Sequence, residues 1–557
     1  MELTLIVVLA LLVIVAVHAL AGRVGVAAPL VLVMVGIAVS LVPAVPEIEI
    51  GPEWILGVVL PPLLYAAAVR VPTMDFRRDF KVISGLSVVL VVISSVVIGW
   101  VISMLIPGIG LATGIALGAI VSPTDAVATS IVRKARVSPR IVTVLEGESM
   151  LNDASALVLL RSAIAATGAS VSLWGVVGDF LYAVAVAVVI GLIVGHLNLA
   201  VRAKLGDPTA GVAITIVAPF AAYLPAEHLH ASGLVAAVVA GLVAGHGTPR
   251  RLTAQDRATE RAVWGTLEFV LESAVFLLIG LELEAIVRDV EDQHGNPWQA
   301  LVYASVVVAL VLVLRSGFVG PLIWWMSRRQ RRFPELRERI NEAQGRVAAA
   351  PDHPRSKRIG WVLNQKLADI DYFTEVQFGR RAAVVLVWAG MRGAVTLAAA
   401  QTLPAETPQR SLLVLIAFVV AVGTLIIQGG TLPWLVGRLG LSGGDPGATE
   451  REREELRSHL RTTSRAWLDE QERLDDSVLD DAMIERLRRL MEAQESAEPA
   501  FDIAQVRRMR LAVIDADRAE LLRLSELGTF SSQVIDEQLN RLDAEQIGLE
   551  LRDHEDD

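Results

Sequence analysis

The chain of 557 residues contains no cysteine, which excludes disulfide bonds, thiolate catalysis and cysteine-ligated zinc. It has no P-loop motif, no Gly-x-Ser-x-Gly motif and no dinucleotide-binding fingerprint, so primary ATP-driven pumping has no support. The sequence has no basic patch of the kind that binds nucleic acid. The N-terminus lacks the basic region and small-residue cleavage site of a signal peptide, so the first apolar run is read as a retained span. We therefore expect no enzyme, no cofactor and no nucleic-acid partner.

Apolar runs of about 20 residues dominate what is present, and 53% of the residues are hydrophobic. Runs of this length cross a lipid bilayer as helices. The sequence therefore predicts an all-α polytopic membrane protein with about 13 transmembrane helices. The expected spans are 3–20, 24–42, 53–69, 82–106, 111–132, 141–166, 173–201, 209–224, 230–247, 263–287, 298–326, 382–403 and 411–437.

Basic residues lie in every second loop between these runs, and only Arg288 and Arg410 lie in the other set of loops. The positive-inside rule then places the N-terminus outside and the C-terminus in the cytoplasm. Two soluble parts become cytoplasmic: a charged loop at 327–380, and a tail at 441–557 with 30 acidic and 16 basic residues.

The tail carries apolar residues at helical spacing, which predicts an acidic helical domain. These residues are Leu456, Leu460, Trp467 and Leu474, followed by Ile484, Leu487 and Leu490. The tail either serves stability and dimer contacts or regulates the membrane part.

Two acids lie near the centre of the sixth expected span, in Gly147-Glu148-Ser149-Met150-Leu151-Asn152-Asp153-Ala154. A charged side chain at this depth is costly and by default marks a functional site. Helical spacing pairs Glu148 with Asn152 and Ser149 with Asp153 on adjoining faces. Carboxylate, amide carbonyl and hydroxyl oxygens are the ligands that hard cations prefer. The alternative is a buried polar network that only fastens helices together.

The fifth span contains Ser122-Pro123-Thr124-Asp125, again at its middle. Pro123 removes a backbone donor and disturbs the helix. Freed carbonyls at such a break can ligate an ion, and Asp125 can neutralise the positive end of the second half-helix. A plain proline kink is the alternative.

Two arginines, Arg315 and Arg392, lie inside the eleventh and twelfth spans, so both are expected to need acidic partners. Counted against Asp125, Glu148 and Asp153, they leave a shared site with a net charge of −1. One proton or one monovalent cation would neutralise that site, as 1:1 exchange requires. The arginines also fit purely structural salt bridges.

Spans one to six and eight to thirteen run in opposite directions, and in that scheme the fifth and twelfth spans are equivalent. Both contain a helix-disturbing element at mid-span: Pro123 in one, and Gly390 with Gly393 in the other. Such a pattern is typical of secondary transporters. We predict two inverted six-helix repeats whose broken helices cross.

Together with Gly390-Met391-Arg392-Gly393-Ala394, these motifs resemble the sodium/proton exchangers of the monovalent cation–proton antiporter family. The match is to the electroneutral branch with an Asn-Asp pair, and it covers about 1–440. The resemblance implies antiport of Na⁺, or of K⁺ or Li⁺, against H⁺ by alternating access. It implies that Asp153 is the carboxylate that binds the ion and the proton, and that Asn152 orients the site and contacts Glu148. It further implies that Ser149 and the Thr124 backbone are cation ligands. Asp125 would balance the charge of the broken helices, and Arg315 would pair with Glu148.

The resemblance also implies a homodimer in a bacterial inner membrane, with roles in pH and cation homeostasis. Within a transmembrane domain at 1–440, a scaffold would comprise about 1–70 and 209–287, and a mobile core about 82–166 and 298–437; a separate C-terminal domain would occupy 441–557. Two alternatives remain open: a transporter of another solute on the same scaffold, and a membrane sensor of ions or pH without turnover.

One departure from the family concerns the third span. Many relatives carry an acid that helps to bind the cation after Pro-Pro, two apolar residues and an aromatic; here Tyr65 is followed by Ala66. Cation preference is therefore left open by the sequence. Glu272, in the tenth span, lies in a stretch that also resembles a family motif. It shares a helix face with Glu268, and the two acids fit either a role in the scaffold or cavity or a helix face that is partly exposed to water.

Overall fold

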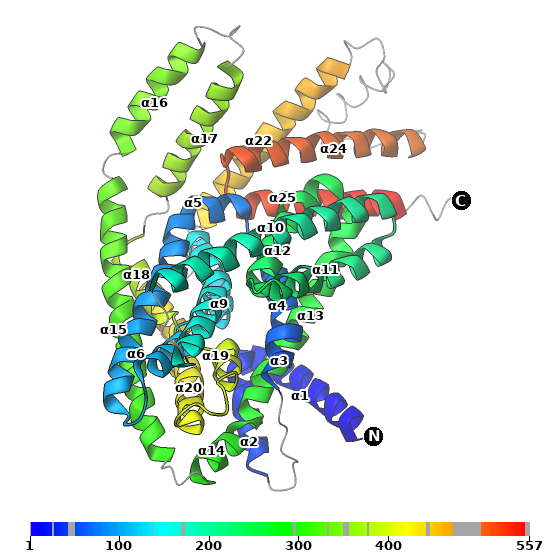
Figure 1. Ribbon diagram of the computed structural model, residues 1–557. Coiled ribbons are helices and arrows are strands. Elements are labelled where there is room, and N and C mark those ends of the chain that lie inside the picture. The colour runs from blue at the N-terminus through cyan, green and yellow to red at the C-terminus, as the bar shows by residue number, and fades with distance from the viewer. Residues whose placement is uncertain are drawn as a thin grey trace. The chain divides into compact units, whose positions relative to one another are not determined.

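The computed structural model describes residues 2–24, 27–42, 51–135, 137–168, 173–292, 297–330, 333–348, 356–375, 378–441, 446–471 and 503–551. Every regular element within these ranges is a helix (Figure 1). The predicted all-α class is confirmed.

Each expected span coincides with one helix or with a short series of helices, in which η denotes a π-helical turn. The first and second spans are α1 (Glu2–Val24) and α2 (Ala28–Ser40), and the third is the series α3 (Pro52–Trp54), η1 (Ile55–Val59) and α4 (Leu60–Arg70). The fourth span is the series α5 (Thr73–Ser84), η2 (Gly85–Val89) and α6 (Leu90–Leu105). The fifth is α7 (Leu111–Val121) with α8 (Val127–Lys134), and the sixth is α9 (Pro139–Gly168). The seventh, eighth and ninth spans are α10 (Leu173–Leu205), α11 (Pro208–His228) and α12 (Gly233–Arg251). The tenth is α13 (Ala254–Leu281) with α14 (Leu283–Asp292), and the eleventh is α15 (Pro297–Gln330). The twelfth is α18 (Arg380–Trp388) with α19 (Ala394–Gln401), and the thirteenth is the series α20 (Arg410–Thr424), η3 (Leu425–Gly429) and α21 (Gly430–Arg438).

Six continuous helical stretches in the described residues are long and apolar enough to cross a membrane on those criteria alone: Thr4–Ala21, Thr73–Leu105, Gly178–Leu205, Pro208–His228, Pro297–Gln330 and Arg410–Arg438. Shorter apolar helices in the described residues are Ala28–Ser40, Ile55–Arg70 and Leu111–Val121. The count of 13 membrane crossings and the inverted repeat stay predictions.

Helix α15 illustrates how these helices divide their surface between protein and lipid. Its buried side chains follow one stripe at intervals of three or four residues, from Ala300 through Val311 and Arg315 to Ile323. The other faces expose large apolar side chains, with Val313 at 66% and Trp324 at 58% of their accessible surface. Exposed apolar surface of this extent indicates a lipid-facing helix.

The two expected helix breaks are present. Helix α7 ends at Val121 and α8 begins at Val127, whereas α18 ends at Trp388 and α19 begins at Ala394. Proline at 123 cannot donate to the helical ladder, and Gly393 adopts φ −146° and ψ −146°, outside the helical region. The short non-helical segments between the halves leave backbone groups at the middle of the helix bundle, where the site is built.

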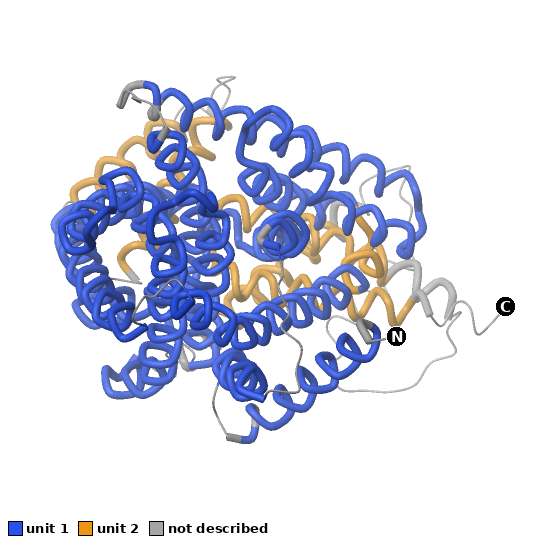
Figure 2. Tube along the Cα trace, turned by 60° about the horizontal axis from the view of Figure 1, so that its bottom comes forward, with its two compact units in different colours: residues 1–251, 259–331, 376–444 blue, residues 252–258, 332–375, 445–557 orange. Residues whose placement is uncertain are grey.

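The described chain separates into two compact units, coloured in Figure 2. Unit 1 comprises Met1–Arg251, Thr259–Arg331 and Val376–Gly444, and unit 2 comprises Leu252–Ala258, Arg332–Glu375 and Asp445–Asp557. The loop at 332–375 thus groups with the tail. The finer division of the membrane part into scaffold and core stays a prediction.

Unit 2 contains α16 (Phe333–Ala348), α17 (Ser356–Glu375), α22 (Pro446–Gln471), α24 (Ile503–Leu527) and α25 (Ser532–Leu551). Its hydrophobic core includes Leu456 and Leu460, two of the residues that predicted a helical tail, packed with residues of α24 and α25 such as Ile514 and Val534. Trp467 lies on α22 and is half-buried, whereas Leu474, Ile484, Leu487 and Leu490 lie outside the described residues.

Candidate functional site

Asp125 links the two broken helices through their N-terminal ends. Its Oδ1 accepts a hydrogen bond from the backbone N–H of Val127 at 2.8 Å, and its Oδ2 accepts one from Ala394 at 3.3 Å. Its own N–H donates to the carbonyl of Met391 at 2.8 Å. One carboxylate therefore caps both α8 and α19, where the helix dipoles favour negative charge.

Arg392 links the C-terminal ends of the other two half-helices, α7 and α18, through its guanidinium. Its Nε donates to the carbonyl of Val121 at 2.7 Å, its Nη2 donates to that of Ser122 at 3.3 Å, and its Nη1 donates to that of Gly390. These carbonyls belong to the ends of α7 and α18, which favour positive charge. The expectation of an acidic partner is wrong for Arg392: in the described part of the chain its guanidinium is satisfied by backbone carbonyls, which carry the negative ends of two helix dipoles.

The expected ion pair between Arg315 and Glu148 is present. Both Nη atoms of Arg315 bond the two carboxylate oxygens of Glu148, one of them at 2.8 Å, and Nε donates to the carbonyl of Leu386 at 2.8 Å. Both residues are buried. Gly390 leaves room for the guanidinium, because a Cβ there would lie 2.7 Å from Cδ of Arg315.

Asn152 reaches Glu148 only through Thr124. Its Nδ2 donates to Thr124 Oγ1 at 2.7 Å, and this hydroxyl donates to Glu148 Oε1 at 3.3 Å. The direct contact between Asn152 and Glu148 implied by the family is thus replaced by a bridge. The carbonyl oxygen Oδ1 of Asn152 is buried and accepts no hydrogen bond from the described residues. A buried acceptor without a donor is costly, and a cation would satisfy it.

Asp153 lies next to this chain of contacts on α9 and is 6% exposed. Within the described residues its carboxylate has no hydrogen-bond or ion-pair partner. Ser149, one turn earlier on the same helix, is also 6% exposed. Thr124, in the break between α7 and α8, is joined to Asn152, so the four predicted cation ligands belong to two adjoining segments.

Close helix packing holds the first break in place. Helix α6 approaches α7 at Gly99 and Gly118, where an added Cβ would collide with the backbone of the other helix. The approach lets Ser94 and Ser95 of α6 contact the hydroxyl of Ser122 at 2.8 and 3.2 Å. Small residues at such crossings are typical of packed membrane helices.

Ala66 is buried on α4 in the same cluster as Ala154, the residue that follows Asp153. The position at which many relatives carry an acid therefore packs near α9 but offers only a methyl group. Glu268 of α13 forms an ion pair with Arg70 of α4. Glu272 lies one turn further along α13.

The sequence did not indicate a second buried polar network, which joins α4, α10, α11 and α13. Arg202 was expected in a basic loop, but its two Nη atoms bond both carboxylate oxygens of Glu260 at 3.0 Å. Thr215 donates to the same carboxylate at 3.2 Å, and the hydroxyl of Tyr65 contacts Thr215 and Asn198. The partners are far apart in sequence, so no local pattern pointed to them.

Comparison with known proteins gives a family match along most of the chain. The family model described as the transmembrane sodium/hydrogen exchanger matches residues 7–438. The chain is 29% identical over 532 residues to the Na(+)/H(+) exchanger YjcE of Escherichia coli (strain K12), covering 89% of each protein. It is 28% identical over 455 residues to the sodium, potassium, lithium and rubidium/H(+) antiporter of Bacillus subtilis (strain 168), covering 77% of this chain and 61% of that protein.

Among solved structures, the sodium proton antiporter MjNhaP1 from Methanocaldococcus jannaschii at pH 8 matches with a TM-score of 0.54. The sequence identity is 16%, and the match covers 79% of this chain and 99% of the other. At this identity the likeness establishes a common fold.

Proposed function

The chain belongs to the sodium/hydrogen exchanger family, and we propose that Asp153 binds a proton and a monovalent cation in turn. The protein is a multi-pass membrane antiporter that couples cation movement to proton movement. The proposal rests mainly on one observation: Asp153 is the site carboxylate that has no neutralising partner in the described chain. Glu148 is paired with Arg315, and Asp125 caps two helices.

The site residues divide into ligands and supports. Asp153 supplies the charge, and the Asn152 carbonyl, the Ser149 hydroxyl and the Thr124 backbone supply oxygen to a dehydrated cation. Glu148, Arg315, Asp125 and Arg392 hold the broken helices in register. A cation binds the deprotonated carboxylate on one side of the membrane, the site becomes accessible from the other side, and a proton then displaces the cation.

We propose a stoichiometry of one cation for one proton. With the helix ends and the Glu148–Arg315 pair neutralised, the remaining charge of the site is that of Asp153 alone. Na⁺ is the proposed main substrate, with K⁺ and Li⁺ as further candidates. Ala66 supports a broader preference, because a site with one carboxylate depends more on neutral ligands, and one relative is named for exchange of four alkali cations.

The proposed setting is the inner membrane of a bacterium, with the N-terminus outside and the C-terminus in the cytoplasm, as the loop charges favour. The proposed assembly is a homodimer, with the scaffold at about 1–70 and 209–287 as its interface. The mobile core at about 82–166 and 298–437 then contains α6 to α9, α15 and α18 to α21 around Asp153.

Reconstituted proteoliposomes test the assignment. We expect an imposed Na⁺, K⁺ or Li⁺ gradient to drive proton flux through the wild-type protein, and Asp153→Asn to reduce this flux to that of empty liposomes, because an amide neither ionises nor holds the cation's charge. Asp289→Asn, which alters an exposed acid of α14, is the matched control and should behave as wild type. Wild-type exchange by Asp153→Asn would refute the role of Asp153.

The same liposomes test stoichiometry. A 1:1 exchange moves no net charge, so its rate should not change when a voltage is imposed with K⁺ and valinomycin in Na⁺-driven assays. A rate that follows the imposed voltage would contradict the proposed 1:1 exchange, yet leave antiport intact.

A further inference from the structure

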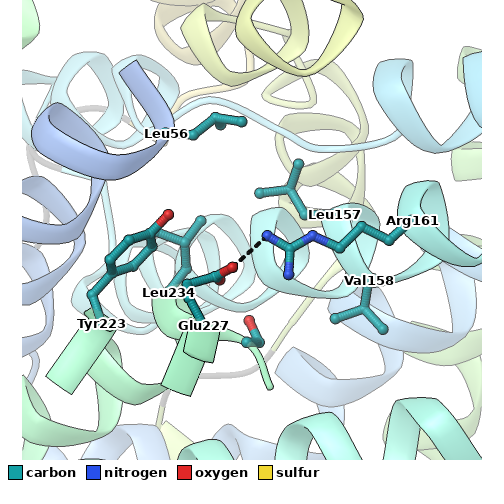
Figure 3. A pocket seen from close by; sticks show the side chains of 8 residues that line it. Leu56, Leu157, Val158, Arg161, Tyr223, Glu227 and Leu234 are labelled. Carbon is teal, nitrogen blue, oxygen red and sulfur yellow. Dashed lines mark hydrogen bonds and ion pairs between the residues drawn. The ribbon is translucent and has the colours of Figure 1, made fainter. Parts of the chain in front are cut away.

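A cavity lies beside α9, beyond Asp153 in the direction of the C-terminal end of that helix (Figure 3). It holds about 290 Å³ of empty volume, part of it open to solvent. Helix α9 contributes Leu157, Val158 and Arg161 to its wall. The facing wall comes from η1, from α11 with Tyr223 and Glu227, and from the start of α12.

An ion pair crosses this cavity. Nη2 of Arg161 donates to Oε2 of Glu227 at 2.8 Å, as the dashed line in Figure 3 shows. The other oxygen of Glu227 accepts a hydrogen bond from the backbone N–H of Gly233 at 3.0 Å, which anchors this carboxylate to the start of α12. The Arg161 side chain is 55% exposed and that of Glu227 is 24% exposed. A pair this accessible to water contributes little stability and breaks readily.

The cavity is aligned with the transport site. Leu157 follows Asp153 by four residues, so it lies one turn further along the same face of α9. Arg161 lies two turns beyond Asp153, or about 12 Å along the helix axis. The loop charges assign this end of α9 to the outside of the membrane.

A second polar contact joins helix ends assigned to the same side. Nε2 of Gln401, at the end of α19, donates to Oε2 of Glu282, between α13 and α14, at 2.8 Å. Both contacts connect the proposed core with the proposed scaffold. Two ion pairs at the opposite helix ends each lie within one part: Arg70–Glu268 within the scaffold, and Arg133–Glu146 within the core.

From this arrangement we propose that the cavity is the outer vestibule of the cation route and that the Arg161–Glu227 ion pair is its gate. The inference rests on the proposed function. With the pair formed, the Arg161 guanidinium places a positive charge on the route and repels an approaching cation. When α9 moves away from α11, Arg161 is withdrawn, and the Glu227 carboxylate with the hydroxyls of Tyr223 and Ser232 faces a hydrated monovalent cation. Gln401–Glu282 acts as a second contact that parts in the same movement.

Thiol accessibility tests the gate without relying on transport, because the natural chain has no cysteine. Leu157→Cys places a thiol in the cavity wall, and a membrane-impermeant maleimide is applied to the outside of intact cells. Arg161→Glu and Glu227→Arg should each raise the labelling rate about fivefold, because like charges repel across the gate, and the double variant should return it to the parent rate. Arg288→Glu, which disturbs an exposed ion pair on α14, is the matched control and should have no effect.

Cross-linking tests the movement. In the double variant Arg161→Cys with Glu227→Cys, a short, reducible bifunctional thiol reagent that joins the two thiols should stop exchange, and a reductant should restore it. The control is the double variant Arg133→Cys with Glu146→Cys, whose two positions lie within one moving part, so its cross-link should not stop exchange. Unchanged labelling in both charge-reversal variants, or full exchange by the cross-linked 161–227 protein, would overturn the gate while the antiport function stands. If the parent protein exchanged no alkali cation, the proposed function would fail and the labelling rates would still decide on the gate.

Discussion

Asp153 differs from three other buried acids of unit 1 in its surroundings. Glu148, Asp79 and Glu260 each face a buried arginine, and those pairs are closed by two or more hydrogen bonds. Such pairs offset the cost of taking charge out of water, so they serve the fold. A carboxylate left without a counter-charge in the described chain instead requires a mobile one, which a proton or an alkali cation provides.

The Glu148–Arg315 pair gives a prediction about stability. Glu148→Leu leaves the Arg315 guanidinium buried without a counter-charge, which should reduce the free energy of unfolding by about 3–5 kcal/mol. Thermal denaturation in detergent measures the loss as a lowered melting temperature. Glu284→Leu, which breaks the exposed pair with Arg288, is the control and should cost about 1 kcal/mol or less. Equal losses in the two variants would show that burial does not strengthen the first pair.

Residue patterns in the sequence located the acids of the site but not all of their partners. Depth within an apolar run is enough to identify Asp125, Glu148 and Asp153, because charge there is costly whatever the tertiary structure. Partners depend on packing between distant segments. Arg392 was expected to meet an acid and meets helix ends instead, and Arg202 was expected in a basic loop and is buried against Glu260.

At the scale of elements, the crossing of the two broken helices organises the site. Proline and glycine predicted where each helix breaks, because both residues act on the local backbone. The crossing itself joins Asp125 to Ala394 across 269 positions, and Arg392 to Val121 across 271. Local patterns carry no information on such contacts.

Gly393 provides a test of the crossing. A Cβ at this position would overlap the carboxylate of Asp125, so Gly393→Ala should push this side chain away from the N-terminal ends of α8 and α19. We expect exchange in proteoliposomes to fall about tenfold or more, since lost capping of both half-helices amounts to at least 1.4 kcal/mol.

The control is Gly423→Ala on α20, where an added Cβ meets no other atom within 4 Å. This variant should exchange as wild type does. Normal exchange by Gly393→Ala, with the protein folded, would mean that the site tolerates displacement of Asp125 from the crossing.

At the scale of the whole molecule, the tail is more closely tied to the loops than the sequence suggested. Residues 252–258 belong to unit 2 and include the start of α13, whose remainder belongs to unit 1. Arg257 in this segment bonds both carboxylate oxygens of Asp543 on α25, with Nε to Oδ2 at 2.9 Å, and both side chains are buried. The charge pattern predicted that the tail is a separate acidic domain, but a contact across 286 positions had no local signature.

Asp543 therefore gives the prediction for the whole molecule. Asp543→Leu leaves Arg257 buried without its partner and also removes a contact with Arg518 at 3.3 Å, so α25 should detach from residues 252–258. Limited proteolysis of the full-length protein should cut the tail about tenfold faster, as expected for a loss of 1.4 kcal/mol or more in local stability. The control, Glu537→Leu, breaks the exposed pair with Arg453 and should be cut at the wild-type rate. Equal cleavage of both variants would show that Arg257 and Asp543 do not hold the tail.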